Sequence, residues 1–470
     1  MQALPTVPST LLSAEELATR VKPGPRYTSY PPATCFTPDV GPDRAGEILT
    51  GLAAAADRPI GLYVHVPFCP SLCWYCGCNV EVTRDRSRGK GYVELLLAEL
   101  DLVRARLGAR PVAALSLGGG SPNFLSSADL TRLVEGIDAR FGFDAGAELH
   151  AELDPRATTI EQVETLGALG FSRLSVGVQD FSIDVQKAIH RVQSMEQTAR
   201  LIGAARDAGF RSVNIDLIYG LPLQTIESIT TTMDRVLLLH PDRMALFGYA
   251  HVPHLRPHQR LVEKAGPMPG SVARAELLLA ALAVAERAGY VRIGLDHLAA
   301  PDDELVKAAA SGGLERNFQG YVVKKAETLI GVGASAISDT GDAYWQNHAE
   351  LGPWTEAVER GELPVARGVV LDAEDQLRRH VITRLMCDGH LDLADVSARF
   401  GIDAEAHFAR ELAALEAGPE AGLAVWDREA RALRATAEGE LLIRNVCMLF
   451  DTHLPVDMGA PGRPRHSPTI

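Results

Sequence analysis

Long hydrophobic runs are absent from this sequence, and so is any recognisable targeting segment. The longest apolar run, LLLAALAVA at 277–285, is short and is flanked by Glu276 and Glu286, so it predicts an amphipathic or buried helix and no membrane span. The first residues, MQALPTVPSTLL, contain neither a basic cluster nor a long apolar core, which is not the pattern of a signal peptide. We therefore expect the protein to act in the cytoplasm.

Cysteine and positive charge are also scarce. The chain has seven cysteines in 470 residues, and four of them fall between positions 69 and 78. In a reducing compartment such clustering favours metal or redox chemistry over disulfide bonds. With 46 Lys and Arg against 60 Asp and Glu, the net charge is −14, which argues against a nucleic-acid-binding protein. An anionic ligand would have to be bound by basic residues that are concentrated locally.

A pattern of strand followed by helix recurs six times along the chain, without short repeats or low-complexity tracts. Each strand-like run ends in a polar or glycine-rich tip. The six runs are GLYVHVP (61–67), ALSLGGGSP (114–122), ELHAELDPR (148–156), RLSVGVQD (173–180), SVNIDLIYGLP (212–222) and RMALFGYAH (243–251). Six such units predict an α/β fold with parallel strands in a barrel or partial barrel, whose chemistry lies at the carboxyl ends of the strands. A doubly wound open sheet is the alternative that periodicity leaves open.

The pattern also predicts the domain organisation. The βα units lie within 51–365, and the preceding segment, 1–50, has little periodicity of its own and is expected to form an arm over the barrel. Beyond residue 365 the order helix, helix, short hairpin, helix predicts a small helical or winged-helix-like domain over 366–456. The segment 457–470 ends in APGRPRHSPTI, and its proline and glycine content predicts a flexible tail.

The cysteine cluster has the spacing C-x3-C-x2-C in Cys69, Cys73 and Cys76, with Cys78 two residues later. Three thiolates on one loop can bind one side of a cubic iron–sulfur cluster. A zinc site would require a second CxxC-type pair or distant histidines, and the other cysteines of the sequence stand alone. A structural zinc, or a closed cluster with Cys78 as fourth ligand, is the less favoured alternative. Three ligands leave one iron open for a substrate or cofactor.

This segment resembles the radical S-adenosylmethionine superfamily in its cysteine spacing and in the aromatic Tyr75 before the last cysteine of the motif. The resemblance implies a 4Fe–4S cluster on Cys69, Cys73 and Cys76, whose open iron is chelated by S-adenosylmethionine and whose electron cleaves the cofactor to a 5′-deoxyadenosyl radical. The tip GGGSP at 118–122 matches the superfamily's motif for the methionyl amino group. The resemblance to the superfamily also implies a partial (β/α)6 barrel related to the TIM barrel, with a small, mainly helical carboxyl-terminal domain.

A closer resemblance covers about residues 20–455. The chain is similar, in the right order, to the oxygen-independent coproporphyrinogen III oxidase family in the segments GPRYTSYPPA, YVHVPFCPSLCWYCGCN, LSLGGGSPNFL, AELDPR, RLSVGVQDF, NIDLIYGLPLQT, GLDHLAAPDDEL, RNFQGY, SAIS and LLIRNVCMLFDT. The RYTSYP arm and the CGCN ending favour this family over its haem-chaperone relatives. The resemblance implies a haem-biosynthetic oxidoreductase that decarboxylates two propionates of coproporphyrinogen III to vinyl groups, giving protoporphyrinogen IX.

The resemblance also implies which residues contact the cofactor. Two molecules of S-adenosylmethionine are expected beside one cluster. The positions that match contact residues are Tyr63, Tyr75, Gly119, Gly120, Ser121, Glu152, Gln179, Arg191, Asp216, Ala250 and Ile337. An unidentified electron donor and electron acceptor are required as partners, and a monomer is expected.

The residue types at three of these positions suit that role. The carboxylates of Glu152 and Asp216 can accept hydrogen bonds from ribose hydroxyls or the methionyl ammonium, and Arg191 can bind a carboxylate with two parallel hydrogen bonds. The alternatives are a satisfied buried carboxylate for Asp216 and a solvated helix-end charge for Arg191. The role of His65 is left open. Arg26, Tyr27 and Tyr30, in the arm, could close over a bound anionic substrate.

Two departures from the family affect the side that faces the substrate. The run after RNFQGY is 322–327 with sequence VVKKAE, where the family commonly has threonines and a later aspartate, and Val80 stands where a lysine is frequent. Two other functions stay open on the sequence alone. One is a haem-binding carrier that keeps the cluster, and the other is an electron-transfer protein with a closed cluster.

Overall fold

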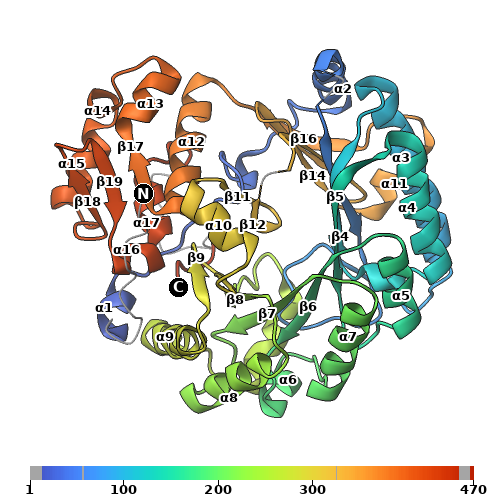
Figure 1. The fold of residues 1–470 in the computed structure, drawn as a ribbon, viewed down its shortest axis with the longest axis horizontal. Helices are drawn as coiled ribbons and strands as arrows, with labels where there is room; N and C mark the ends of the chain where they lie inside the picture. The colour runs from blue at the N-terminus through green and yellow to red at the C-terminus, as the bar shows by residue number, and fades with distance from the viewer. Residues whose placement is uncertain (1–12, 56–57, 324, 455–465) are drawn as a thin grey trace.

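The computed structural model describes residues 13–55, 58–323, 325–454 and 466–470. Figure 1 shows two bodies, a large curved sheet wrapped by helices and a smaller group of carboxyl-terminal helices in orange and red. Within the described ranges, no helix combines the length and the apolar character that a membrane crossing requires.

Six parallel strands form the centre of the large sheet. They are β1 (Ile60–Val66), β4 (Val112–Gly119), β5 (Phe143–Leu153), β6 (Arg173–Gln179), β7 (Ser212–Tyr219) and β8 (Arg243–Gly248). They lie in chain order, each hydrogen-bonded in parallel to the next. A doubly wound sheet reverses its strand order at a switch point, so this continuous order excludes it and confirms the partial barrel.

The sheet extends beyond these six strands to a total of twelve in the described chain. Beyond β1 the sheet continues, in this order outward, with β13 (Thr328–Val332), β14 (Ile337–Asp339), β15 (Ala343–Asn347) and β16 (Val365–Val370). Beyond β8 it continues with β10 (His297–Ala299) and then β9 (Val291–Ile293). Sequence reasoning did not predict these flanking strands. Because β16 belongs to this sheet and ends at Val370, the sheet extends past the predicted boundary at residue 365.

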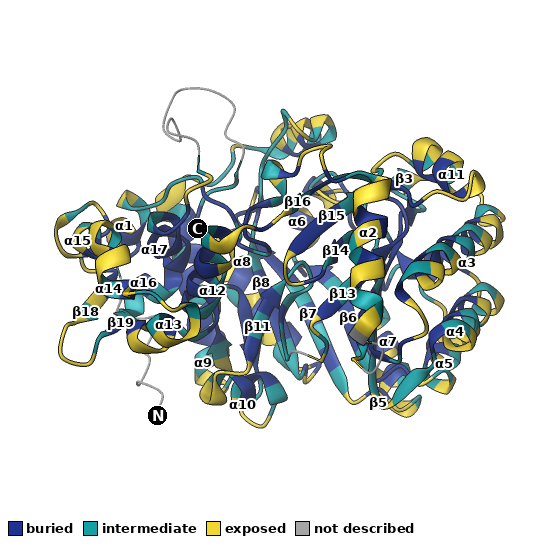
Figure 2. Ribbon diagram, turned by 90° about the horizontal axis from the view of Figure 1, so that it is seen from above, coloured by how far each residue is buried: buried dark blue, intermediate teal, exposed yellow. Residues whose placement is uncertain are grey.

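Helices cover the outer surface of the sheet, as Figure 2 shows for the buried strands and the exposed outer helix faces. They are α3 (Arg88–Leu107), α4 (Ser127–Phe141), α5 (Ile160–Ala168), α6 (Ile183–Ala188), α7 (Met195–Asp207), α8 (Ile226–Leu237) and α9 (Ser271–Arg287). The helices α5, α7 and α8 each begin with a capping box, which satisfies amide groups at their first turns. The apolar run 277–285 lies within α9 and is mostly buried, as predicted for it.

The two faces of each barrel strand differ in polarity. On β5, Leu149 and Leu153 are buried against the helices, while Glu148, His150 and Glu152 line a cavity inside the barrel. Successive strand residues point to opposite faces, so each strand supplies one apolar row to the core and one polar row to the interior. The barrel therefore has a polar interior enclosed by an apolar outer layer.

The carboxyl-terminal helices follow the predicted winged-helix-like order. They are α12 (Ala373–Asp388), α13 (Leu393–Phe400), α14 (Ala404–His407), α15 (Ala409–Ala417), α16 (Ala437–Leu441) and α17 (Ile443–Leu449), with a small sheet of β17 (His390–Asp392), β18 (Ala424–Asp427) and β19 (Ala432–Ala435).

The amino-terminal segment packs between the two bodies. It contains α1 (Ala14–Thr19) and α2 (Pro42–Leu52), and the buried residues Leu17, Tyr27 and Tyr30 belong to the main hydrophobic core. The Tyr27 hydroxyl donates to Asp451 at 2.9 Å. The arm is thus packed into the main hydrophobic core and does not merely lie over the barrel.

The tail needs a second correction. Residues 466–470 lie beside the arm: Pro23 and Pro468 form an antiparallel bridge, and Ile470 is only 2% exposed. The prediction of a flexible tail over 457–470 is therefore wrong for 466–470, while 457–465 lie outside the described residues. Packing against the arm, which composition does not encode, holds this segment.

Candidate active site

The cysteine loop begins where β1 ends. It runs from β2 (Phe68–Cys69) to β3 (Glu81–Val82), two short strands that pair in parallel and close its base. The amide of Thr83 donates to the carbonyl of Cys69 at 2.9 Å. The loop therefore returns to its starting point and holds Cys73, Cys76 and Cys78 at the carboxyl end of the first barrel strand.

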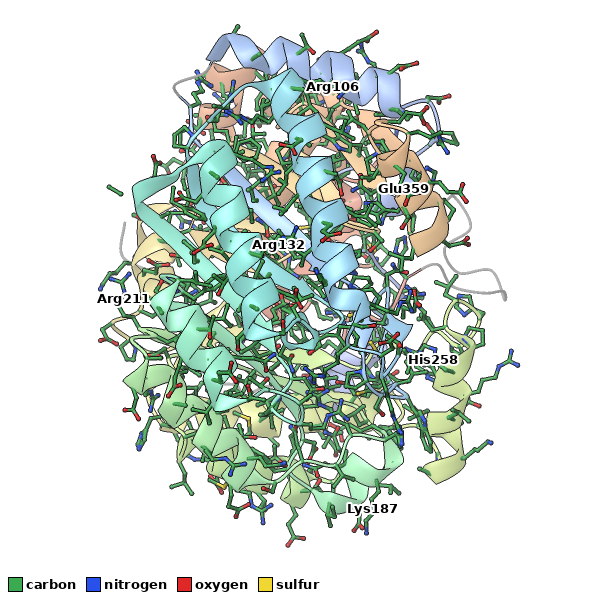
Figure 3. The ribbon with its side chains drawn as sticks, turned by 90° about the vertical axis from the view of Figure 1, so that its right-hand side faces the viewer. Arg106, Arg132, Lys187, Arg211, His258 and Glu359 are labelled. Carbon is green, nitrogen blue, oxygen red and sulfur yellow. The ribbon has the colours of Figure 1, made fainter. Side chains whose placement is uncertain are left out.

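Side chains from a distant segment bind the backbone of this loop. Arg256 Nε, His258 Nε2 and Gln259 Nε2 donate to the carbonyls of residues 77, 76 and 75 at 3.0, 2.8 and 2.8 Å. They lie at the start of η5 (Pro257–Ala265), which follows β8. In Figure 3, His258 and Arg211, which directly precedes the first residue of β7, lie on opposite sides of the view. Sequence reasoning missed these three residues, whose only signal is a polar run in the loop after β8.

A second group of contacts holds the two ends of the loop. His190 Nδ1 donates to the carbonyl of Leu72 at 2.8 Å, and its ring stacks on Trp74 with centroids 5.0 Å apart. At the other end His65 Nε2 donates to the carbonyl of Asn79 at 3.0 Å. Burial lowers the pKa of His65 to about 4, so this ring is neutral at physiological pH. His65, whose role the sequence left open, is thus a structural support of the loop.

Two arginines lie against the thiol of Cys73. Arg156 Nη2 and Arg191 Nη1 donate to its sulfur at 3.2 and 3.5 Å. Asp154 bridges the two cations, at 2.6 Å from Arg156 and 3.3 Å from Arg191. Burial opposes ionisation of Asp154, but Arg191 and Arg156 lower its pKa below the ordinary value. Nearby cations favour a thiolate, which is the form that binds iron.

The pKa values of the three remaining thiols of the loop are shifted in different directions. A hydrogen bond from Cys78 lowers the pKa of Cys76 to about 7, and the same bond raises the pKa of the Cys78 thiol. Burial raises the pKa of Cys69 to about 12, so metal binding must displace the proton of that thiol. Cys78 is the most exposed of the four.

These thiols suit a polynuclear cluster better than a single ion. In the described part of the chain no three His, Cys, Asp or Glu side chains converge as a mononuclear metal site requires. In a cubic iron–sulfur cluster each cysteine binds a different iron, so its ligands stand apart. The four loop cysteines carry free thiols. The loop geometry and the cations at Cys73 therefore fit a cluster on Cys69, Cys73 and Cys76.

The glycine tip of β4 packs directly under this loop. A Cβ on Gly120 would lie 2.7 Å from the backbone carbonyl of Pro67, and one on Gly119 would lie 2.8 Å from the ring of His65. Gly119 also has φ +111°, a conformation that side chains disfavour. Its amide donates to the carboxylate of Glu152. Only glycine fits at these two positions.

A cavity of about 360 Å³ fills the barrel interior and has the predicted carboxylates in its wall. Glu152 and Asp216 both line it, and Asn214 Nδ2 donates to Asp216 at 2.8 Å. Burial and the charge of Asp216 raise the pKa of Glu152 to about 7. Burial likewise raises the pKa of Asp216 to about 6. These carboxylates can accept from a polar or cationic ligand in the cavity.

A second cavity of about 600 Å³ opens beside the cysteine loop. It is lined by Cys78, Asn79 and the predicted residue Ile337, and Phe318 lines both cavities. The departure at Val322 lies in the wall of the first cavity, whereas Glu327 forms an exposed ion pair with Arg58 at 2.9 Å. Of Val322 and Glu327, the first and last residues of the departure at 322–327, only Val322 therefore faces a cavity.

The other predicted residues are spread around the mouth. Arg191 binds the carboxylate of Asp154 through two hydrogen bonds of 3.4 and 3.3 Å and also donates to the carbonyl of Gly177, and its Nε is buried without a partner among the described residues. Gln179 has φ +69° at the end of β6. Ser121 is 2% exposed, hydrogen-bonds to Asn123 and lines neither of these two cavities.

Three further positions support the loop. The Tyr63 hydroxyl bonds to His65 Nδ1 at 3.2 Å. Tyr75 packs against a buried apolar cluster that includes Tyr249 and Val262. The carbonyl of Ala250 accepts from Gln259 at 3.2 Å, so the same amide group joins this position to the cysteine loop.

The fold and the cysteine loop define a class of protein. Residues 63–236 match the family model of the radical SAM superfamily, and residues 371–442 match that of the HemN C-terminal domain. The chain is 42% identical over 431 residues to the oxygen-independent coproporphyrinogen III oxidase of Escherichia coli, covering 92% of this chain and 93% of that relative. The Pseudomonas aeruginosa protein of the same name is 41% identical over 436 residues, covering 92% and 94%.

A solved structure agrees with these matches. The structure described as "Coproporphyrinogen III oxidase (HemN) from Escherichia coli is a Radical SAM enzyme" superposes with a TM-score of 0.86 at 42% identity, covering 91% of this chain and 98% of that one. The chain is therefore a radical SAM protein. Within that superfamily it belongs to the oxygen-independent coproporphyrinogen III oxidases.

Proposed function

We propose that this protein decarboxylates two propionate side chains of coproporphyrinogen III oxidatively, without oxygen, and so forms the two vinyl groups of protoporphyrinogen IX. The observation that supports this most directly is the cysteine loop fixed beside two polar cavities at one end of the barrel. The names of the relatives and the match over nine-tenths of the chain supply the substrate.

Cys69, Cys73 and Cys76 would hold one 4Fe–4S cluster, and Cys78 would stay outside it. When bound, the cluster and S-adenosylmethionine supply a 5′-deoxyadenosyl radical that removes a hydrogen atom from the propionate β-carbon. The protein binds, orients and shields. Arg156 and Arg191 would stabilise the Cys73 thiolate, and Glu152 and Asp216 would accept from the ribose hydroxyls or the methionyl ammonium.

We expect two molecules of S-adenosylmethionine beside the cluster. The cavity beside the cysteine loop has a volume of about 600 Å³, within the range of small-molecule pockets, and it shares Phe318 with the 360 Å³ cavity in the barrel interior. Each conversion consumes one radical, so two cofactors suit a substrate with two propionates to convert. After hydrogen abstraction, each propionate radical loses carbon dioxide and one electron, which passes to an acceptor.

The electron acceptor and the electron donor for the cluster are further partners of this reaction. A monomer in the cytoplasm remains our expectation for the working protein. A 4Fe–4S cluster with one open iron is compatible with that compartment because its thiolate ligands need reducing conditions.

Anaerobic turnover of the reconstituted protein with coproporphyrinogen III, S-adenosylmethionine and a reductant tests the proposal. We expect protoporphyrinogen IX together with two molecules each of 5′-deoxyadenosine and carbon dioxide. Unchanged tetrapyrrole together with tight haem binding would instead support the carrier function. A third outcome is that neither S-adenosylmethionine nor the tetrapyrrole is cleaved and that the cluster is lost without Cys78. This outcome would support an electron-transfer protein with a closed cluster.

A further inference from the structure

Arg26, in the amino-terminal arm, lies beside β8 at the same end of the barrel as the cysteine loop. Its Nη2 donates to the carbonyl of Gly248, at the carboxyl end of β8, at 2.8 Å, and its guanidinium lies 5.9 Å from the ring centroid of Phe247. Arg26 and Phe247 both line the 360 Å³ cavity. The neighbouring Tyr27 points the other way, to Asp451, so only the arginine of this pair faces the cavity.

The backbone around Arg26 is held on both sides by other arginines. Arg316 Nε donates to the carbonyl of Arg26 at 3.1 Å, and Arg444 Nη1 donates to the carbonyl of Gly24 at 3.0 Å. Gly24 in turn packs so closely on Met448 that a Cβ would lie 2.8 Å from its sulfur. The Arg26 side chain is therefore presented by a rigid backbone, and little conformational freedom remains to be lost when a ligand binds.

Positive charge is in excess at this point. Arg316 is paired with Asp296 through two contacts of 3.2 Å, and His297 Nδ1 also donates to Asp296 at 2.8 Å. Arg26 and Arg444 have no carboxylate within 4.0 Å anywhere in the described ranges. Burial, together with the charges of Arg26 and Arg316, lowers the pKa of Arg444 to about 9.

A buried guanidinium without a counter-ion is costly, and an anion that enters the cavity would remove that cost. The carboxylate of Asp296 acts on Arg26 and Arg444 through its charge, but its hydrogen bonds go to Arg316 and His297. The acidic residues of the cavity wall that carry the cofactor contacts, Glu152 and Asp216, lie on other strands, β5 and β7. The Arg26 end of the cavity is thus suited to a carboxylate and the Glu152 end to hydroxyl or ammonium groups.

We propose that Arg26 binds a carboxylate of the bound substrate, a propionate of the tetrapyrrole that is not being converted. This rests on the function proposed above, and it makes Arg26 a determinant of substrate specificity. A guanidinium matches a carboxylate through two parallel hydrogen bonds, which a lysine reproduces only as a point charge. Phe318, shared by the two cavities, lies between this subsite and the cavity beside the cysteine loop, so a large ligand held at Arg26 can extend toward the cluster.

The carboxylate could also belong to the methionyl group of S-adenosylmethionine, and the experiment separates the two sources. Arg26→Gln, Arg26→Lys and the control Arg58→Gln are prepared as full-length, anaerobically reconstituted protein. Arg58 is an exposed arginine paired with Glu327, far from either cavity. Equilibrium binding is measured with coproporphyrin III as a fluorescent tetracarboxylate, with its tetramethyl ester, and with S-adenosylmethionine. Iron content and melting temperature are recorded for each variant.

We expect Arg26→Gln to weaken coproporphyrin III binding about ten- to a hundredfold and to raise the KM for coproporphyrinogen III similarly, because one charge-assisted pair is lost. Arg26→Lys should recover part of this affinity. The ester should bind wild type and variant alike, and Arg58→Gln should match wild type throughout.

Two results would overturn the inference. One is weaker binding of S-adenosylmethionine with unchanged porphyrin affinity, which assigns the carboxylate to the cofactor. The other is unchanged affinity for both ligands in a variant that keeps its iron and its melting temperature. Failure of the wild type to decarboxylate coproporphyrinogen III would reject the proposed function. The subsite would still stand if porphyrin binding depended on Arg26 and on free carboxylates.

Discussion

The cysteine loop and the Arg26 subsite lie at the same end of the barrel, but they are built in opposite ways. The loop has its four thiols within ten consecutive positions, and distant residues fix its backbone and contact the sulfur of Cys73. The subsite has a single functional side chain, and its supports, Arg316 and Arg444, come from segments that are hundreds of residues away. A sequence motif therefore reveals the cysteine loop, whereas the Arg26 subsite is formed only in the folded protein.

The same contrast applies to how each part should fail. A loop that carries its own ligands fails when a ligand is lost, whatever the rest of the fold does. A subsite held by the packing of an arm between two bodies fails whenever that packing loosens. The following predictions separate these two kinds of dependence.

The largest effect is expected at the cysteine loop itself. Cys73→Ala should abolish the cluster and all cleavage of S-adenosylmethionine, because it removes one of the three predicted cluster ligands, whose sulfur two arginines contact. Cys78→Ala is the matched control and should keep close to wild-type iron. Iron and sulfide content with the visible absorption of the cluster measures both. Equal cluster loss in the two variants would mean that Cys78 is a fourth ligand.

A glycine next to the loop should give the next largest effect. Gly120→Ala places a Cβ 2.7 Å from the backbone of Pro67, so the entrance of the cysteine loop must shift, at a cost of about 1–3 kcal/mol. Cluster occupancy should fall with it. Gly91→Ala is the control, because Gly91 is an exposed helical glycine with open space around it, and this change should be neutral or stabilising by about 0.5–1 kcal/mol. Chemical denaturation and iron content compare the two; equal stabilities would contradict the close packing.

The arm should matter for folding as well as for the subsite. Tyr27→Phe removes the hydrogen bond to the buried Asp451 and should lower the free energy of unfolding by about 1–3 kcal/mol. Because the loop does not depend on the arm, the iron bound per folded molecule should stay unchanged while tetrapyrrole affinity falls. Denaturant titration with and without coproporphyrin III measures this. Loss of iron at unchanged stability would break the distinction between the two regions.

The smallest effect concerns pH. Burial and Asp216 raise the pKa of Glu152 from its ordinary value near 4.5 to about 7, so the folded apoprotein binds more protons than the unfolded chain between these values. Stability contributed by the protonated form is complete below about pH 4.5 and is lost as pH rises through about 7. Glu152→Gln should therefore flatten the decline in stability over this range. Melting temperatures of both apoproteins between pH 5 and pH 8 test it, and parallel curves would reject it.

The fold prediction succeeded where local periodicity was strong. Each of the six strand-like runs forms a strand, and each polar tip lies at a carboxyl strand end, because parallel strands in chain order bring those ends together. The outer strands β13 to β16 and β9 to β10 were missed. They are short and join the sheet through pairing with distant partners, which leaves little trace in local sequence.

The site prediction divides in the same way. Glu152 and Asp216, on barrel strands, line one cavity, and Ile337, at the start of β14, lines the other. Arg191 binds the carboxylate of Asp154 and contacts Cys73, and Ser121 bonds to Asn123, because neighbouring side chains decide which partners each one meets. No sequence pattern indicated Arg256, His258 and Gln259. These side chains donate to backbone carbonyls, which every residue has, so the partner positions require no particular residue type.

The sequence by itself determined the class of this protein, since the cysteine spacing, the glycine tip and the order of the strands are local properties that follow from ligand geometry and backbone sterics. The tertiary structure alone decided the polar mouth that these elements share. Arg26, Arg316, Asp296 and Arg444 come from four separate segments, and only the packing of the arm and tail between the two bodies brings them together. Burial, which no single residue encodes, then leaves the guanidinium of Arg26 facing the cavity with no carboxylate within 4.0 Å among the described residues.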